Sequence, residues 1–196
     1  VSYDPTFAHE VGVILHHGLK RMVEKQDNVF YYITLLNENY AMPAMPDGAA
    51  EGILKGLYSL TRVSPKQKPA KGRKATLFGS GTILREVLAA AETLAAEHGI
   101  ECEVFSAPSY SELRRDALEV ERWNLLHPAE MPRKPYVAQA LEGTTGPFIA
   151  ASDYVRNVPE QIRQWVPGRY VSPITIMVPP EVLEVYMFAN YLSKGD

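Results

Sequence analysis

The sequence lacks several features that mark whole classes of protein. Its one cysteine, Cys102, cannot form a disulfide within the chain, which fits a reducing compartment and predicts a cytoplasmic protein. No run approaches the roughly 18 apolar residues that a membrane-spanning helix needs, so no membrane partner is expected. Residues 1–5 have neither the basic nor the apolar region of a secretory signal peptide, so we expect none. A net charge of −3 gives no electrostatic reason to expect a nucleic-acid partner.

The composition is that of a folded globular chain. Hydrophobic residues make up 46% of the 196 residues and charged residues 22%, both close to globular averages. This length accommodates one large domain, or one domain with a fragment of another.

The first 36 residues predict a helix followed by a buried strand. Asp4-Pro5 is a helix start signal, and apolar residues follow at spacings of three and four up to Met22. Residues 29–36 (VFYYITLL) would be apolar on both faces of a strand, and many of their side chains are β-branched or aromatic. This pattern is typical of a central strand in a parallel sheet.

A connecting region comes next. Residues 37–46 predict a loop, and residues 49–58 a short helix that Gly52 and Gly56 weaken. Residues 62–74 (RVSPKQKPAKGRK) are rich in lysine and arginine and contain no acid. The run can be an anion-binding patch or a solvated linker, and we favour the linker because no aromatic side chains accompany the charges.

Strands then alternate with helices. The pattern predicts strands at 75–78, 101–106, 136–141, 148–151 and 174–178, and helices beginning near 82, 109, 157 and 180. Ser109 and Glu112 form a capping box for the second of these helices. The alternation predicts an α/β fold with a mainly parallel sheet.

Gly79-Ser80-Gly81 lies between a predicted strand and a predicted helix, where a phosphate can bind free amides. Position 84 is leucine where a dinucleotide fingerprint needs its third glycine, and no Gly-Lys-Ser/Thr follows. We therefore favour a plain strand-to-helix turn that needs small residues.

Three histidines share the first predicted helix. His9 is separated from His16 and His17 by seven and eight residues, too far for a chelate, and Glu10 does not repair the spacing. We interpret them as polar-face or interface residues.

Glu38, within the run Asn37-Glu38-Asn39-Tyr40, follows the end of a buried strand, where α/β proteins bind ligands. A lone carboxylate without a base or a metal partner is a weak signal, so we favour a hydrogen-bonding cluster at a domain junction.

The acidic and aromatic residues near the end of the second helix allow an acid/base pocket or a charged helix face, and we favour the face; they are Glu119, Glu121, Arg122, Trp123 and His127. Cys102 alternates inward on a strand and is interpreted as a core thiol. We assign no catalytic, cofactor-binding or metal-binding residue.

Four stretches carry a resemblance to a known family. They are residues 29–58, residues 77–84 (LFGSGTIL), residues 121–128 (ERWNLLHP) and residues 151–154 (ASDY). Together they resemble the C-terminal part of the homodimeric, thiamine-diphosphate-dependent decarboxylating component of bacterial pyruvate dehydrogenase complexes. The resemblance extends in order over about residues 1 to 170.

The resemblance implies a three-layer αβα domain of the transketolase C-terminal type, preceded by a helix-strand stub. By this alignment, residues 1–42 end the pyrimidine-binding domain, 43–70 are a linker, 71–171 form the C-terminal domain, and 172–196 form an unmatched tail. Family members bind thiamine diphosphate and Mg²⁺ through a Gly-Asp-Gly motif, which this sequence lacks. No family catalytic motif maps onto Glu38 or His127, and no cofactor is expected on this chain.

The implied activity belongs to the whole enzyme, which decarboxylates pyruvate and passes the acetyl group to lipoyl groups. Its implied partners are the remainder of the enzyme, a second subunit and the dihydrolipoyl acetyltransferase core. The chain itself is expected to be structural or dimerising, and inactive alone. Two alternatives stay open: a stand-alone nucleotide- or small-ligand-binding domain, and an assembly subunit of a split enzyme. The apolar strand at 29–36 also predicts self-association.

Overall fold

The computed structural model describes residues 1–66 and 73–172. Its elements follow in the order β1 (Ser2–Tyr3), α1 (Ala8–Leu19), the π-helical turn η1 (Lys20–Glu24), β2 (Tyr32–Ile33), α2 (Ala49–Lys55), β3 (Tyr58–Val63), β4 (Lys74–Gly79), α3 (Ile83–His98), β5 (Glu101–Ser106), α4 (Tyr110–Leu126), α5 (Tyr136–Ala140), β6 (Phe148–Ala151), α6 (Asn157–Glu160), the 3₁₀ turn η3 (Arg163–Trp165) and β7 (Tyr170–Val171). No helix in these two stretches is long and apolar enough to cross a membrane.

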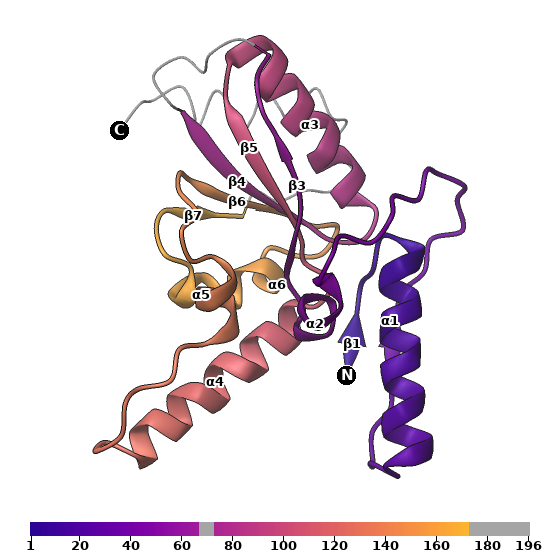
Figure 1. Cartoon of the computed structure of the whole chain (residues 1–196), viewed down its shortest axis with the longest axis vertical. Coiled ribbons are helices and arrows are strands. Elements are labelled where there is room, and N and C mark those ends of the chain that lie inside the picture. Colours follow the sequence, from indigo (N-terminus) through magenta and orange to yellow (C-terminus); the bar gives the residue numbers. More distant parts are fainter. Residues whose placement is uncertain (67–72, 173–196) are drawn as a thin grey trace.

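A five-stranded sheet forms the centre of the molecule (Figure 1). Its strands lie in the order β3-β5-β4-β6-β7, and every neighbouring pair is parallel except β3–β5. The parallel strands are joined by crossovers that contain helices, as parallel pairing requires. The carboxyl ends of β4, β5 and β6 therefore meet at one edge of the sheet.

Helices cover both faces of this sheet. On one face, Val87 of α3 belongs to a buried cluster with Leu77 of β4. On the other face, Leu113 of α4 and Val137 of α5 belong to a cluster with Phe78 of the same strand. Successive residues of β4 thus point to opposite helical layers, as the pleat dictates. The predicted three-layer α/β fold is confirmed.

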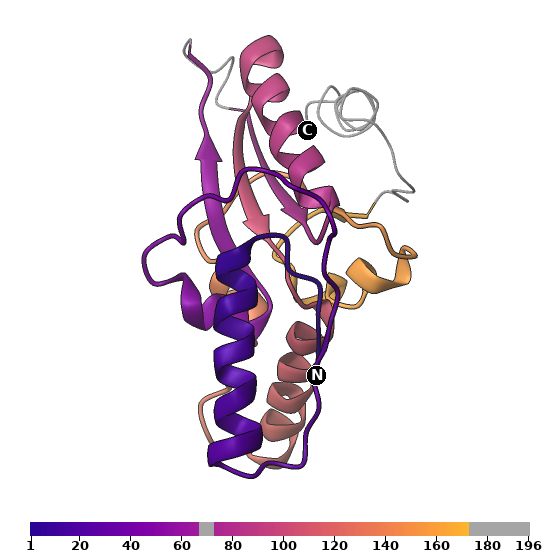
Figure 2. The same ribbon diagram turned by 90° about the vertical axis from the view of Figure 1, so that its right-hand side faces the viewer.

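The N-terminal segment is a smaller unit beside the sheet. β1 and β2 pair in parallel, with Ser2 opposite Tyr32 and Tyr3 opposite Ile33. α1 packs through Ile14 into a cluster that also contains residues of α2 and β3. Figures 1 and 2 show α1 and the far half of α4 extending away from the sheet in the same direction.

The first helix begins later than its start signal predicts. Asp4-Pro5 does not open it, because Ser2–Tyr3 is a strand and α1 starts at Ala8. The free amides at the helix start are bound by the side chain of Glu10 instead.

The predicted buried strand at 29–36 is wrong in its extent and burial. Only Tyr32–Ile33 is extended in a sheet, and it pairs with β1 alone among the described residues. Phe30, Tyr32 and Leu35 are 75%, 64% and 67% exposed. Their apolar surface faces solvent because the described chain supplies no further strand or helix against it.

Two other predicted elements differ. Residues 58–63, placed in a connection on sequence grounds, form the antiparallel edge strand β3. Residues 136–140, predicted as a strand, form helix α5 after Pro135. Val137 and Leu141 are both buried, and their spacing of four is helical.

The strands predicted at 75–78, 101–106 and 148–151 are confirmed as β4, β5 and β6. Ser109 is the N-cap of helix α4 as predicted, and its hydroxyl accepts a hydrogen bond from the Glu112 amide (3.2 Å). The helix predicted from residue 157 is confirmed only as the short α6 followed by η3. The strand predicted at 174–178 and the helix predicted from 180 lie outside the described residues.

Candidate functional site

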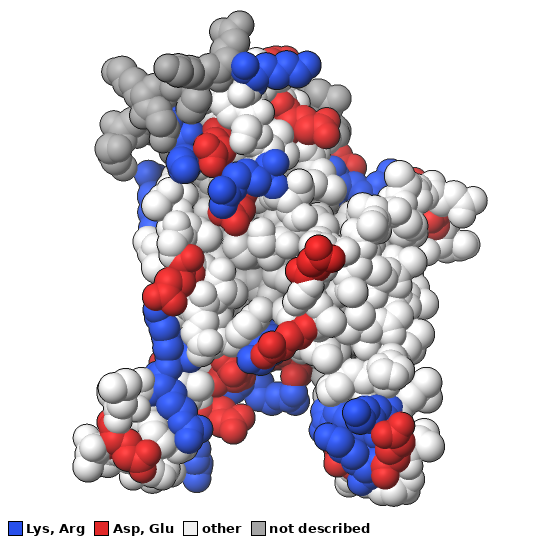
Figure 3. All heavy atoms as spheres, in the orientation of Figure 1, with Lys and Arg blue, Asp and Glu red and all other residues white. Residues whose placement is uncertain are grey.

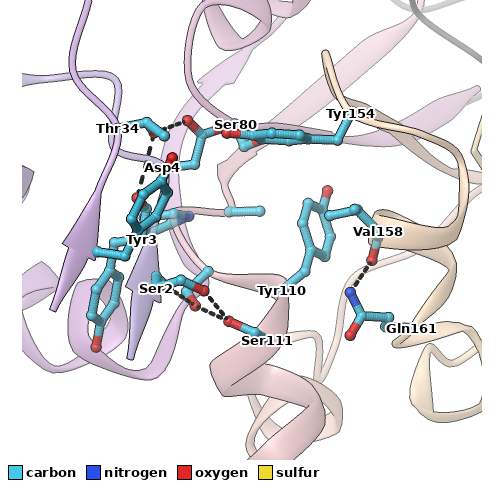
Figure 4. A pocket seen from close by; sticks show the side chains of 14 residues that line it. Ser2, Tyr3, Asp4, Thr34, Ser80, Tyr110, Ser111, Tyr154, Val158 and Gln161 are labelled. Carbon is cyan, nitrogen blue, oxygen red and sulfur yellow. Dashed lines mark hydrogen bonds between the residues drawn. The ribbon is translucent and has the colours of Figure 1, made fainter. Parts of the chain in front are cut away.

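A pocket of about 240 Å³ lies at the edge of the sheet where β4 and β5 end. Figure 4 shows the side chains that line it. They come from four places in the chain: residues 2–4, residues 32–34, the β5–α4 connection with the start of α4, and residues 154–161. Ser80, just after β4, completes the wall. Ligands bind in this location in many open α/β sheets.

Asp4 holds the N-terminal segment against this edge. Its amide donates to the carbonyl of Pro108 (2.7 Å), and its carbonyl accepts from the amide of Gly81 (3.1 Å). Its carboxylate accepts a hydrogen bond from the Thr34 hydroxyl. Burial raises the pKa of the Asp4 carboxyl above its ordinary value, against the lowering effect of hydrogen bonds from Thr34 and Ser80.

Gly81 is required by this contact. Its φ of +51° favours glycine, and a Cβ atom there would come within 2.6 Å of the Asp4 carboxylate. The glycine turn therefore makes room for a carboxylate.

Tyr110, the first residue of α4, stands in the pocket wall (Figure 4). The residue is 4% exposed, and its hydroxyl is buried with no hydrogen-bond partner among the described residues. Burial raises the pKa of this hydroxyl above its ordinary range, and the nearby charge of Asp4 raises it further. A buried hydroxyl without a partner is unusual, because its desolvation is left uncompensated.

The rest of the wall is rich in hydroxyls and poor in charge. Tyr32, Tyr154 and several serines contribute to it, and Gln161 donates its side-chain amide to the carbonyl of Val158 (3.1 Å). None of the described residues that line the pocket is lysine, arginine or histidine. Just outside, burial raises the pKa of Asp153 above its ordinary value.

A second polar centre joins α1 to the sheet. Glu10 is fully buried, and one carboxylate oxygen accepts from the amides of Thr6 (2.5 Å) and Phe7 (2.9 Å). The other oxygen accepts from the hydroxyls of Tyr58 (2.8 Å) and Ser106 (2.5 Å). We call this set of four hydrogen bonds the Glu10 latch. It joins the start of α1 to β3 and β5.

Two histidines of α1 lie within hydrogen-bonding distance of tyrosine hydroxyls. His9 is 3.0 Å from the hydroxyl of Tyr58 and 3.3 Å from the carbonyl of Pro43, and His17 is 3.0 Å from the hydroxyl of Tyr31. No group of three metal-ligating side chains occurs within residues 1–66 and 73–172. His9 and His17 pair with neighbouring tyrosines.

Gly79-Ser80-Gly81 is a strand-to-helix turn of close approach, as predicted. A Cβ atom at Gly79 would come within 2.7 Å of the Leu84 Cα atom. Ser80 is buried and 3.4 Å from the Ser152 hydroxyl. The sequence indicates the turn, and the structure adds that Ser80 faces the pocket.

Glu38 belongs to a surface cluster between the two units. It pairs with Arg85 of α3 (2.6 Å), and the Arg85 guanidinium lies over the ring of Tyr40. Tyr40 in turn donates its hydroxyl to the carbonyl of Thr6. This arrangement matches the predicted hydrogen-bonding cluster at a junction.

The residues at the far end of α4 form a surface stack. The rings of Trp123 and His127 are stacked with centroids 4.3 Å apart, and the Arg133 guanidinium lies over the Trp123 ring, 3.7 Å from its centroid. Glu121 accepts a hydrogen bond from the indole of Trp165 (2.8 Å). Glu119, Glu121 and Arg122 are exposed, and Trp123 and His127 are half-buried, which fits the charged-face interpretation.

Cys102 is a buried core thiol, and burial raises its pKa to about 12. The described ends of the basic run pair with acids of β5: Arg62 with Glu103 (3.1 Å) and Lys74 with Glu101 (3.4 Å). Residues 67–72 of that run lie outside the described residues.

Two family models match this chain, one over its N-terminal segment and one over the unit that contains the five-stranded sheet. The family model described as the transketolase-like C-terminal domain matches residues 56–172. The chain belongs to this family. The model described as the middle domain of the pyruvate dehydrogenase E1 component matches residues 1–43.

The chain is similar to pyruvate dehydrogenase E1 components. It is 52% identical over 168 residues to that of Pseudomonas aeruginosa, covering 86% of this chain and 19% of the relative. It is 53% identical over 169 residues to that of Escherichia coli K12, covering 86% of this chain and 18% of the relative. The chain thus spans about a fifth of the length of these relatives.

A solved structure shows the same fold. A transketolase mutant from Pichia stipitis superposes with a TM-score of 0.55 at 14% identity, covering all of this chain and 26% of that one.

Proposed function

We propose that this chain is the C-terminal portion of a pyruvate dehydrogenase (acetyl-transferring), an oxidoreductase that acts on a 2-oxo acid. The whole enzyme decarboxylates pyruvate and reductively acetylates lipoyl groups, in the cytoplasm and in support of glycolytic carbon flow. The observation that carries the proposal is the identity of 52–53% to two E1 components over 86% of the chain. Two family models in consecutive order support it.

The thiamine diphosphate and Mg²⁺ of the enzyme are proposed to bind outside this portion. The described residues do not fit such a site. The pocket wall has no cation to face a diphosphate, and no three metal-ligating side chains cluster within residues 1–66 and 73–172. We therefore assign the portion a structural and dimerising role, without catalytic activity of its own.

The proposed partners are the remainder of the enzyme, a second subunit and the dihydrolipoyl acetyltransferase core. Support for the first comes from the face that Phe30, Tyr32 and Leu35 expose on β2 and its flanks. Only a 43-residue piece of this chain matches the middle-domain model. The rest of that domain is the proposed cover of this apolar face.

Calorimetric titration of the chain with thiamine diphosphate and Mg²⁺ tests the assignment, with carbon dioxide release from pyruvate measured on the same sample. We expect neither heat nor turnover. Saturable cofactor binding would contradict the assignment and favour a stand-alone ligand-binding domain. Activity appearing only with a second polypeptide that carries Gly-Asp-Gly would favour a split enzyme.

A further inference from the structure

One histidine of α1 extends the Glu10 latch toward the surface. The Nε2 atom of His9 lies 3.0 Å from the Tyr58 hydroxyl, and that hydroxyl donates to the Glu10 carboxylate (2.8 Å). The Nδ1 atom of the same ring lies 3.3 Å from the carbonyl oxygen of Pro43, in the connection formed by residues 37–46. Because the His9 side chain is half-buried, it links a buried carboxylate to an exposed segment of main chain.

The hydrogen bonds of the latch decide which nitrogen of His9 carries a proton. Burial, followed by the charge of Glu10, raises the pKa of the Tyr58 hydroxyl well above its ordinary value, so Tyr58 keeps its proton. That single proton can go to Glu10 or to His9, and a carboxylate is the stronger acceptor of the two. The Tyr58 oxygen therefore offers a lone pair to His9, and Nε2 must be the donor.

This assignment leaves Nδ1 of the neutral ring without a proton, opposite the oxygen of Pro43. Two lone pairs that face each other make no hydrogen bond. Histidine side chains gain their second proton between about pH 5 and pH 8, and in this ring only Nδ1 is left to take it. The hydrogen bond from His9 to Pro43 thus exists only in the protonated state, when the ring donates to both neighbours at once.

The immediate surroundings of the ring suit a positive charge. The ring of Phe7 is stacked on that of His9 with centroids 5.6 Å apart, a distance at which a cation is attracted to an aromatic face. The negative charge of Glu10 lies one side chain away, beyond Tyr58. Protonation of His9 therefore places a cation between an aromatic face and a buried carboxylate.

The other charged groups of the elements around His9 are paired with one another. They are Glu51 with Lys55 of α2 (2.8 Å), and Arg85 of α3 with Glu38 of the 37–46 connection (2.6 Å). Tyr40 of the same connection lies under the Arg85 guanidinium and donates its hydroxyl to the carbonyl of Thr6. Among the described residues, the hydrogen bonds of His9 thus lead to one charged group, Glu10.

We propose that His9 is a pH-responsive clamp between α1 and the 37–46 connection. At basic pH the ring donates to Tyr58 alone, and packing is all that holds Pro43 beside it. At acidic pH the added N–H donates to the Pro43 carbonyl and fastens the connection to the start of α1. Because this connection leads from β2 to α2, the clamp tightens the junction between the two units. The proposal does not depend on the proposed function.

Side-chain nitrogen shifts of the isotope-labelled chain test the clamp directly. At about pH 8 we expect His9 to show a protonated Nε2 and a bare Nδ1. Lowering the pH to about 5 should move Nδ1 to the protonated position, and the carbonyl carbon of Pro43 should shift downfield in the same titration. A neutral ring protonated at Nδ1, a ring that gains no proton over this range, or a Pro43 carbonyl that does not follow the ring would each overturn the proposal.

His9→Gln and His16→Gln form a matched pair of variants. Glutamine at position 9 keeps an N–H donor for Tyr58 but has no group that titrates, whereas His16 is an exposed histidine of the same helix. Backbone order parameters of residues 41–45 should rise at acidic pH in the wild type and in His16→Gln, and stay constant in His9→Gln. A full pH response in His9→Gln, or its loss in both variants, would overturn the proposal. The wild-type nitrogen titration stays decisive if His9→Gln does not fold.

Discussion

The two units of the chain differ in how they satisfy their apolar residues. The five-stranded sheet encloses its own side chains between two helical layers, so that Leu77 and Phe78 are both fully buried. The N-terminal segment has two strands of two residues each and leaves Phe30 and Leu35 largely exposed. The larger unit buries the apolar side chains of its central strand, whereas the smaller unit leaves those around β2 exposed.

Apolar packing and buried hydrogen bonds both attach the smaller unit to the larger one, and Phe7 belongs to the buried cluster that α3 forms with β4. The Glu10 latch and the main chain of Asp4 bind β3, β5, Pro108 and Gly81. Figure 3 shows a cluster of Lys and Arg side chains at the lower right, at the free end of α1, where Lys20, Arg21 and Lys25 occur. Cutting the latch should therefore affect the two units unequally.

The largest effect is expected from Glu10→Ala. The substitution leaves two hydroxyls and two amides without their buried acceptor, so we expect a loss of about 3–5 kcal/mol of unfolding free energy. Urea unfolding measures this loss. Amide exchange should become faster in α1 while it stays slow in β4. A loss below about 1 kcal/mol would mean that the latch does not hold the segment.

Leu84→Ala and Leu35→Ala compare the two units directly. Leu84 lies in the first turn of α3 and is fully buried, and its truncation should cost about 2–5 kcal/mol. Leu35 is exposed in the chain, so the same truncation should change the unfolding free energy by less than about 0.5 kcal/mol. Equal costs in urea unfolding would show that residues 29–36 are buried in solution.

The pH dependence of stability should carry a contribution from Asp4. Its folded-state pKa is raised, so the folded state prefers the protonated carboxyl. Its contribution to stability is present at low pH and is lost as pH rises through the folded pKa. Asp4→Asn should remove this component, and urea unfolding from acid to neutral pH measures it. A wild-type component of the opposite sign would contradict the raised pKa.

The smallest effect on stability, yet a clear effect on association, is expected from Phe30→Ser combined with Leu35→Ser. Both side chains are exposed, so the unfolding free energy should change by less than about 0.5 kcal/mol. Self-association in sedimentation velocity at tens of micromolar should decrease. A wild-type chain that is strictly monomeric would contradict an open apolar face.

Local signals in the sequence predicted much of the larger unit. β4 and β6 contain short apolar runs, β5 alternates polar with apolar residues, and Ser109 is a capping residue at the start of α4. The strand β3 escaped prediction because Arg62 and Thr61 continue into a basic run. Its strand character depends on pairing with β5 rather than on its own pattern.

The pocket and the latch could not be predicted in this way. Glu10 is polar by sequence and is buried only because Tyr58 and Ser106, 48 and 96 residues away, supply hydroxyls. Asp4 gave a helix start signal, yet its main chain binds the β5–α4 connection. Tyr110 has no sequence signal beyond its place at a helix start. Such centres depend on tertiary contacts between distant segments.

Reconstitution tests the central claim most directly. The chain would be mixed with a pyruvate dehydrogenase E1 component of Escherichia coli from which the matching C-terminal region has been deleted. We predict that the two polypeptides co-purify as a complex and that the complex recovers carbon dioxide release from pyruvate. The double substitution Phe30→Ser with Leu35→Ser should weaken this complex at least tenfold. A chain that stays separate from this partner at tens of micromolar, with no recovery of activity, would contradict the account.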